Sequence, residues 1–177
     1  MNFYVRRFNL YLLPLLVALA ADGCASTKDK LQKVGAIRIH VESPVAIPDK
    51  TNTIKLPRTD PVVLTIDEDP AVTERNIMAA TLLDTPGGFS IRVRFDETGA
   101  WMIEQATAGN PGKHLVIFCQ WGNTISDARW LAAPLITHRI ANGEITFTPD
   151  ASREEALKLV EGLNHTAKLM NTGKDDE

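Results

Sequence analysis

Residues 89–95 read FSIRVRF and form the clearest strand pattern in the chain. Apolar and polar side chains alternate at every step, so the apolar ones fall on one face of an extended strand. The polar residues Ser90, Arg92 and Arg94 fall on the other face. This alternation is typical of an antiparallel sheet that covers a core on one side, and we expect the polar face to meet water or a partner.

Two predicted helices follow. Asp96 can cap a helix that runs to about Ala108, and residues 109–112 (GNPG) end it, because glycine supplies a left-handed cap and proline cannot continue a helix. Its inward-facing side chains are predicted to be Ala100, Ile103 and either Ala106 or Thr107. Residues 152–155 (SREE) form a capping box that predicts the second helix. The apolar stripe of that helix is Ala156, Leu159, Val160, Leu163 and Ala167.

The remaining pattern adds strands and predicts the fold class. We expect strands over residues 34–41, 62–66, 114–120 and 143–148, whereas residues 74–83 fit a short helix or a strand equally well. The first strand should carry Arg38 and His40 on a polar face. Two helices among hairpin-like strands predict an α+β fold, in which the helices pack on one face of a mainly antiparallel sheet.

Prolines divide the chain before this domain. Residues 43–61 contain four prolines and allow at most a short edge strand around residues 53–56. We therefore expect a polar tether and proline-rich extension over residues 24–60, a main domain over residues 61–170 and a polar tail over residues 171–177.

Residues 1–23 have the layout of a secretory signal peptide: two arginines, an apolar run over residues 10–21, and then small residues. The run is shorter than the roughly 20 residues that a membrane span needs. Cys24 follows in the sequence LAADGC, which resembles the lipobox of bacterial lipoproteins, where the cysteine is acylated. The alternative is ordinary cleavage near Ala20, which would release a free secreted protein.

Composition and motifs exclude several functional classes. The chain has 177 residues, of which 44% are hydrophobic, and a formal net charge of −3, so it can bury a core and lacks a basic field for nucleic acid. No phosphate-binding glycine loop and no Gly-x-Ser-x-Gly elbow is present. The four histidines are scattered singly. We expect no enzymatic activity, metal, cofactor or small-molecule substrate.

Two features near residue 120 remain. Cys119 ends an apolar strand and should be a buried thiol, with a disulfide to Cys24 as the alternative if Cys24 carries no lipid. Trp121, Arg129 and Trp130 flank the following loop and are candidate partner contacts, because exposed aromatic and arginine side chains are common at interfaces. The alternative is that they cover the edge of the core.

An ordered series of short motifs resembles the head subdomain of the first periplasmic domain of SecD, a subunit of the SecDF complex that assists bacterial protein export. The resemblance covers about residues 61–168. It is carried by FDETGA at 95–100, TAGNPGKHL at 107–115, GNTIS at 122–126, GEI at 143–145 and SREEA at 152–156.

This resemblance implies a role in protein export, but not that of a proton-driven motor. In the family, transmembrane helices couple proton flow to export, and no apolar stretch after Cys24 is long enough to span a bilayer. We expect a binding module in the cell envelope, facing the periplasm and held by lipid on Cys24, that contacts exported polypeptides or the export machinery. The alternative is a structural or assembly lipoprotein that uses the same fold for another protein partner.

Overall fold

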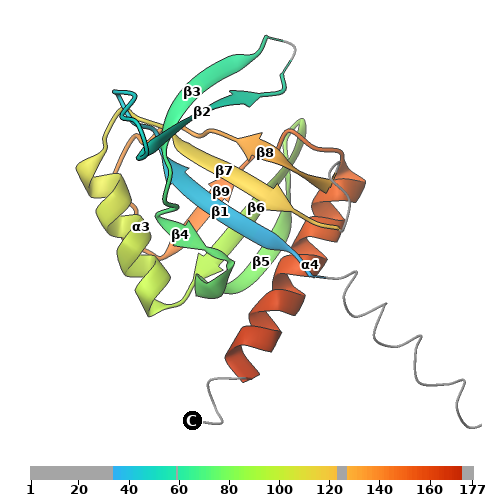
Figure 1. Cartoon of the computed structure of the whole chain (residues 1–177). Helices are drawn as coiled ribbons and strands as arrows, with labels where there is room; N and C mark the ends of the chain where they lie inside the picture. The colour runs from blue at the N-terminus through green and yellow to red at the C-terminus, as the bar shows by residue number, and fades with distance from the viewer. Residues whose placement is uncertain (1–33, 59, 123–126, 173–177) are drawn as a thin grey trace, which may run out of the picture. The chain divides into compact units, whose positions relative to one another are not determined.

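The computed structural model describes residues 34–58, 60–122 and 127–172, and the strands in it form three antiparallel sheets (Figure 1). Sheet A has the order β4-β1-β7-β8, with β4 (Val72–Thr73), β1 (Ala36–Val41), β7 (Leu115–Gln120) and β8 (Ala128–Ala132). Sheet B is the hairpin of β2 (Thr51–Leu56) and β3 (Val62–Asp67). Sheet C has the order β5-β6-β9, with β5 (Ile77–Thr85), β6 (Gly88–Phe95) and β9 (Glu144–Phe147).

The predicted strand at residues 89–95 is β6, at the centre of sheet C. Ile91 and Val93 are fully buried, whereas Arg92 and Arg94 are exposed, as the alternation predicted. Ser90 differs from the prediction because it is buried, with its hydroxyl 3.2 Å from that of Thr148. Thr148, which directly follows β9, therefore covers the start of the polar face of β6.

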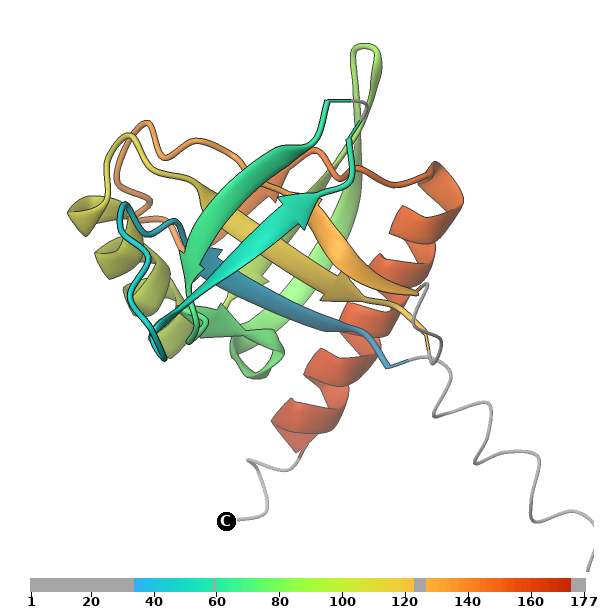
Figure 2. The same ribbon diagram turned by 45° about the horizontal axis from the view of Figure 1, so that its top comes forward.

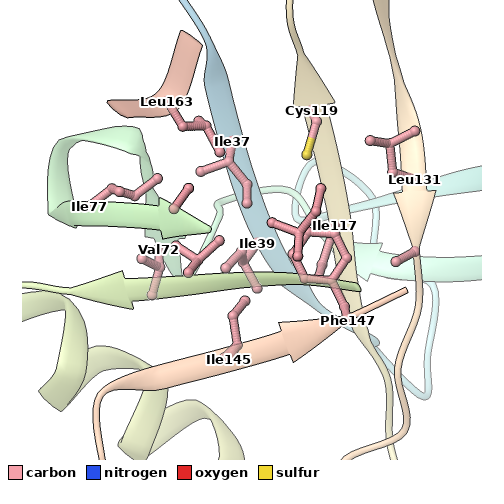
Figure 3. Close-up of a cluster of buried hydrophobic side chains, with 14 of the residues drawn as sticks. Ile37, Ile39, Val72, Ile77, Ile117, Cys119, Leu131, Ile145, Phe147 and Leu163 are labelled. Carbon is pink, nitrogen blue, oxygen red and sulfur yellow. The ribbon is translucent and has the colours of Figure 1, made fainter. Parts of the chain in front are cut away.

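Sheets A and C share the main core. Figure 3 shows side chains of β1, β7 and β8 meeting those of β9, with Leu163 of the C-terminal helix beside Ile37. Ile37, Ile39 and Ile117 are fully buried, and burying each such side chain contributes roughly 1.5–3 kcal/mol. The side chain of Cys119 is fully buried, as predicted, and burial raises the pKa of its thiol.

The β2–β3 hairpin covers the opposite face of sheet A (Figure 2). A second apolar cluster lies between them and contains Leu56, Leu64, Ile66 and Val116. This hairpin explains why the predicted polar face of β1 was wrong at His40, which is only 7% exposed. Its Nδ1 lies 2.8 Å from the carbonyl oxygen of Asp67, and burial lowers the pKa of the imidazole.

Both predicted helices are present: α3 (Glu97–Gly109) and α4 (Arg153–Thr172). Asp96 caps α3, because the Gly99 N–H donates to its carboxylate at 2.7 Å. The buried residues of α3 are Gly99, Ile103 and Thr107. The capping box of α4 is also formed: the Ser152 N–H donates to Glu155 at 2.7 Å, and the Glu155 N–H donates to the Ser152 hydroxyl at 3.2 Å.

Helix α4 packs mainly on β5 and also reaches the start of β1. There, a Cβ added to Gly35 would lie 2.7 Å from the backbone nitrogen of Leu163, so only glycine lets the two backbones approach this closely. The Thr166 hydroxyl donates to the Gly35 carbonyl at 2.8 Å. The α+β class with mainly antiparallel pairing is confirmed, although the pairing divides among three sheets.

Two parts of the sequence prediction are changed by the structure. Residues 74–83, which fitted helix or strand, form a short 3-10 helix η1 (Glu74–Asn76) followed by β5. The folded unit also starts well before Pro61, since β1 lies between β4 and β7 and β2 pairs with β3 along its whole length. The expected extension over residues 24–60 therefore contains two strands of the fold.

Candidate functional site

The candidate contact residues Trp121, Arg129 and Trp130 do not form an exposed surface. Trp121 is only 6% exposed and belongs to the main core, which corrects the expectation that it faces a partner. The reason is that it continues the inward alternation of β7, in step with Ile117 and Cys119. Trp121 has little surface to offer another protein.

Arg129 and Trp130 also make their contacts within the fold. The Arg129 guanidinium lies over the Trp121 ring at 4.8 Å and donates to both carboxylate oxygens of Glu155, at 3.0 and 3.2 Å. Trp130 points to the other face of sheet A, where its ring meets the rings of Phe118 and His40 edge to face, at 5.3 and 5.4 Å. The structure brings Trp121 and Arg129 together and places Trp130 in the second apolar cluster.

A cavity with a largely apolar lining lies elsewhere, beside β9. It has a volume of about 590 Å³ and is bounded by β9, the first half of β7 and the connecting segment 134–142. Its apolar lining includes Leu115 and Ile117 from β7 and Ile145 and Phe147 from β9. These residues belong to the main core, so the cavity opens onto the apolar interior between sheets A and C.

A second hollow of about 320 Å³ adjoins the first along the same strand. It is lined by residues 132–134 and 146–148, together with Arg58 and Ser90, and the two hollows share Pro134, Thr146 and Phe147. We call the combined feature the β9 groove. Residues 144–148, which include β9, form one wall, and residues 132–142 form the other. It runs the whole length of β9.

The rim of the β9 groove is polar, and its charges are paired. Arg139 forms an ion pair with Glu104 of α3, and Arg92 lies 3.9 Å from the carboxylate of Glu144. Leu135, which is 51% exposed, adds an apolar side chain at the same rim. An apolar floor with a neutralised rim favours an uncharged, partly apolar ligand.

The ionisable side chains that line this groove contact partners within the fold. His138 is the histidine in its lining, and its Nδ1 lies 2.9 Å from the hydroxyl of the neighbouring Thr137. His114 pairs instead with Glu42, at 2.6 Å. Within residues 34–58, 60–122 and 127–172, no three side chains of the metal-binding types come together.

Sequence reasoning missed the groove because three separate segments build it. The strand at residues 143–148 was predicted, and it is β9, but its neighbours across the groove come from residues 115–117 and 134–142. The exposed Leu135 next to Pro134 was the one local signal available.

Cys24 and the signal segment lie outside the described residues. Among the helices that the structure describes, none is both long and apolar enough to cross a membrane.

Comparison with solved structures shows the same fold in SecDF. A structure of SecDF in its super-membrane-facing form aligns with a TM-score of 0.54 and 18% identity, over 80% of this chain and 21% of that one. A second, of SecDF as a membrane component that enhances protein export, aligns with a TM-score of 0.53 and 18% identity, over 82% of this chain and 70% of that one. This chain thus spans about a fifth of the first of these proteins.

No curated protein matches the sequence closely enough to count as a relative. The sequence model of the SecDF P1 head subdomain matches residues 51–167, which include β2 through most of α4. That span is well over half of the chain, and it agrees with the motif series at residues 95–156. The chain therefore belongs to the SecDF P1 head subdomain family.

Proposed function

We propose that this chain is a non-catalytic binding module of the cell envelope that contacts polypeptides in the course of protein export. The β9 groove carries the proposal: it is apolar inside, and the charged side chains at its rim are paired. Membership of the SecDF P1 head subdomain family supports the link to export.

Photocrosslinking tests this function. A photoreactive residue at Leu135 sits at the groove rim, and the matched control is Val63, an aliphatic residue of β3 that is 62% exposed and lies outside the groove lining. During active secretion, position 135 should capture exported chains or translocon components, and position 63 should not. Equal capture at both positions, or none at either, would contradict the proposal.

The identity of the captured protein separates this function from its alternative. Exported chains or export components support the proposal. A folded envelope protein captured from position 135, in cells that are secreting normally, would instead favour an assembly lipoprotein that uses the same fold.

We also propose that lipid on Cys24 holds the module at the membrane, facing the periplasm. The support is the signal-like segment at 1–23, the lipobox-like LAADGC, and the polar stretch over residues 25–33 that leads to β1. Mass spectrometry of the native protein should find an acylated Cys24 at the N-terminus. An unmodified N-terminus near Ala21 would refute the anchor and leave the groove proposal standing.

A further inference from the structure

The free edge of β9 presents backbone groups to the groove. The Phe95 N–H donates to the Gly143 carbonyl at 3.0 Å, and in the β6–β9 register Val93 then bonds with Ile145 and Ile91 with Phe147. Hydrogen-bonded pairs alternate with unbonded ones in an antiparallel ladder. The N–H and carbonyl groups of Glu144 and Thr146 therefore point away from β6, toward the open edge.

Three of these four groups are available to a ligand. The Glu144 N–H donates to the side-chain oxygen of Asn142 at 3.2 Å. Among the described residues, the Glu144 carbonyl and both backbone groups of Thr146 have no protein partner. Together they repeat the donor and acceptor spacing that one strand offers to the next.

The facing wall carries backbone groups of the same kind. Leu115 donates to the Pro134 carbonyl at 3.0 Å, and Ile136 donates to the Lys113 carbonyl at 2.8 Å. Leu135 lies between Pro134 and Ile136 and faces His114 as a non-hydrogen-bonded pair of this short antiparallel ladder. Its own N–H and carbonyl therefore point away from β7. Leu135 is also one of the residues that line the cavity.

The other edge of sheet C is closed. At β5, the Asn164 side chain of α4 accepts from the Ala80 N–H at 2.8 Å and donates to the Ala80 carbonyl at 2.9 Å. An open strand edge is a site where another chain can pair, and folds usually cover such edges. Sheet C covers β5 in this way and leaves β9 facing an apolar groove.

From this contrast we infer that the β9 groove binds an extended polypeptide segment as an added strand, paired with β9 through Glu144 and Thr146. The inference rests on the proposed function and deepens it by naming the binding mode. Backbone pairing provides affinity with little sequence preference, and alternate side chains of the segment would lie on Leu115, Ile117 and Phe147. The preferred segment has apolar residues at alternate positions and no proline opposite Thr146.

A peptide pair tests the backbone pairing directly. The probe is a seven-residue peptide of alternating valine and threonine with blocked ends, and its control carries N-methyl groups on the three central amides, which removes the donors and keeps the side chains. The first peptide should slow hydrogen exchange at the Thr146 amide by about tenfold or more when it saturates the protein, and the methylated one should bind at least about tenfold more weakly. Equal binding of both peptides would overturn strand addition.

A substitution on the protein gives the reciprocal test. Thr146→Pro removes the outward N–H without breaking a bond to β6, because proline is tolerated on an edge strand where the N–H faces outward. The matched control Thr146→Val keeps that N–H. We expect about tenfold weaker peptide binding for T146P and unchanged binding for T146V. Unchanged binding by a folded T146P would contradict the inference, and if T146P does not fold, the methylated peptide on the natural protein decides.

The outcomes also separate this inference from the proposed function. Capture of exported chains from position 135 together with equal binding of both peptides would leave the function standing and remove strand addition. A self-association that strengthens with concentration and is abolished by T146P but not by T146V would show a second copy as the occupant, and would overturn the inference in its present form.

Discussion

At the scale of single residues, Arg129 joins three parts of the fold. Its guanidinium stacks on Trp121, donates to both oxygens of Glu155 and reaches the Asp150 carbonyl at 3.2 Å. The planar fork of arginine matches a carboxylate in a way that a lysine ammonium cannot. Arg129 thus connects β8, the end of β7 and the first turn of α4.

The first prediction concerns this fork. Arg129→Lys keeps the charge but loses the bidentate pairing and the stacking on Trp121, so the free energy of unfolding should fall by about 1–2 kcal/mol. Urea unfolding measures it. The control Arg75→Lys changes an exposed arginine and should shift the unfolding free energy by less than about 0.5 kcal/mol. Equal effects of the two substitutions would show that the Arg129 contacts contribute nothing specific.

The second prediction is a pH dependence from Glu155. Its hydrogen bonds from Arg129 and from the Ser152 backbone lower the pKa of the carboxyl from 4.5 to about 2. The unfolded chain therefore takes up this proton at a higher pH than the folded protein does, and stability is lost as the pH falls from about 4.5 toward 2. Glu155→Gln removes this contribution, so the difference in unfolding free energy between the two proteins should shrink across that range. A difference that stays constant from pH 6 to pH 2.5 would be inconsistent with the shift.

Trp121 shows how much of a single residue's burial the sequence could predict. The alternation of residues 115, 117 and 119 extends to 121 and could have placed its ring in the core, but the glycine at 122 suggested an exposed turn. Arg129, whose guanidinium lies over the ring, is eight residues further along the chain, and this contact follows no local period. Burial of such an aromatic residue is decided by tertiary packing.

At the scale of elements, the two edges of sheet C differ in how they are covered. Helix α4 lies along β5 and inserts Asn164 as a substitute for a neighbouring strand, whereas none of the described residues pairs with the outer edge of β9 in this way. The amide side chain supplies one donor and one acceptor in the spacing of a backbone peptide. Helix α4 therefore protects one edge while the groove exposes the other.

The third prediction tests this protection. Asn164→Ala leaves the Ala80 N–H and carbonyl without their partner at a half-buried edge, which should cost about 1–3 kcal/mol of unfolding free energy. Hydrogen exchange at the Ala80 amide should also accelerate. The matched control is Asn171→Ala, the same change at an exposed position of the same helix, and it should affect neither. If N171A and N164A behave alike, the edge bonds carry no stability.

Local sequence could not assign two of the elements. Strand β5 reads IMAATLLDT, which is rich in residues that favour helices, and becomes a strand because it pairs with β6 along most of its length. Strand β8 reads ARWLA, too short for periodicity to show. The capped helices and the alternating β6 were predictable because their signals are local. The groove was not, since its walls meet only after both sheets have formed.

At the scale of the whole molecule, β1 is the strand on which sheet A depends. It pairs with β4 on one side and over six residues with β7 on the other, and it contributes fully buried Ile37 and Ile39 to the core. It also meets α4 through the close approach of Gly35. These contacts tie the β-sheet core to the C-terminal helix, although the prolines after β1 suggest a boundary in the sequence.

The last prediction follows from this central position. A fragment of residues 34–177 should unfold cooperatively in urea, whereas a fragment of residues 61–177 should not, because it lacks β1 and leaves β7 and the Ile117 layer of the core uncovered. A third fragment, residues 43–177, keeps the β2–β3 hairpin and removes β1 alone. It should also fail to unfold cooperatively, since losing two buried isoleucines removes roughly 3–6 kcal/mol of burial against a total stability of about 5–15 kcal/mol.

The tryptophan near-ultraviolet circular dichroism reports the packing of Trp121 and Trp130 in each fragment. A native signal and a cooperative transition in residues 61–177 would restore Pro61 as the true start of the domain, and the same result in residues 43–177 alone would assign the essential role to the hairpin instead of β1.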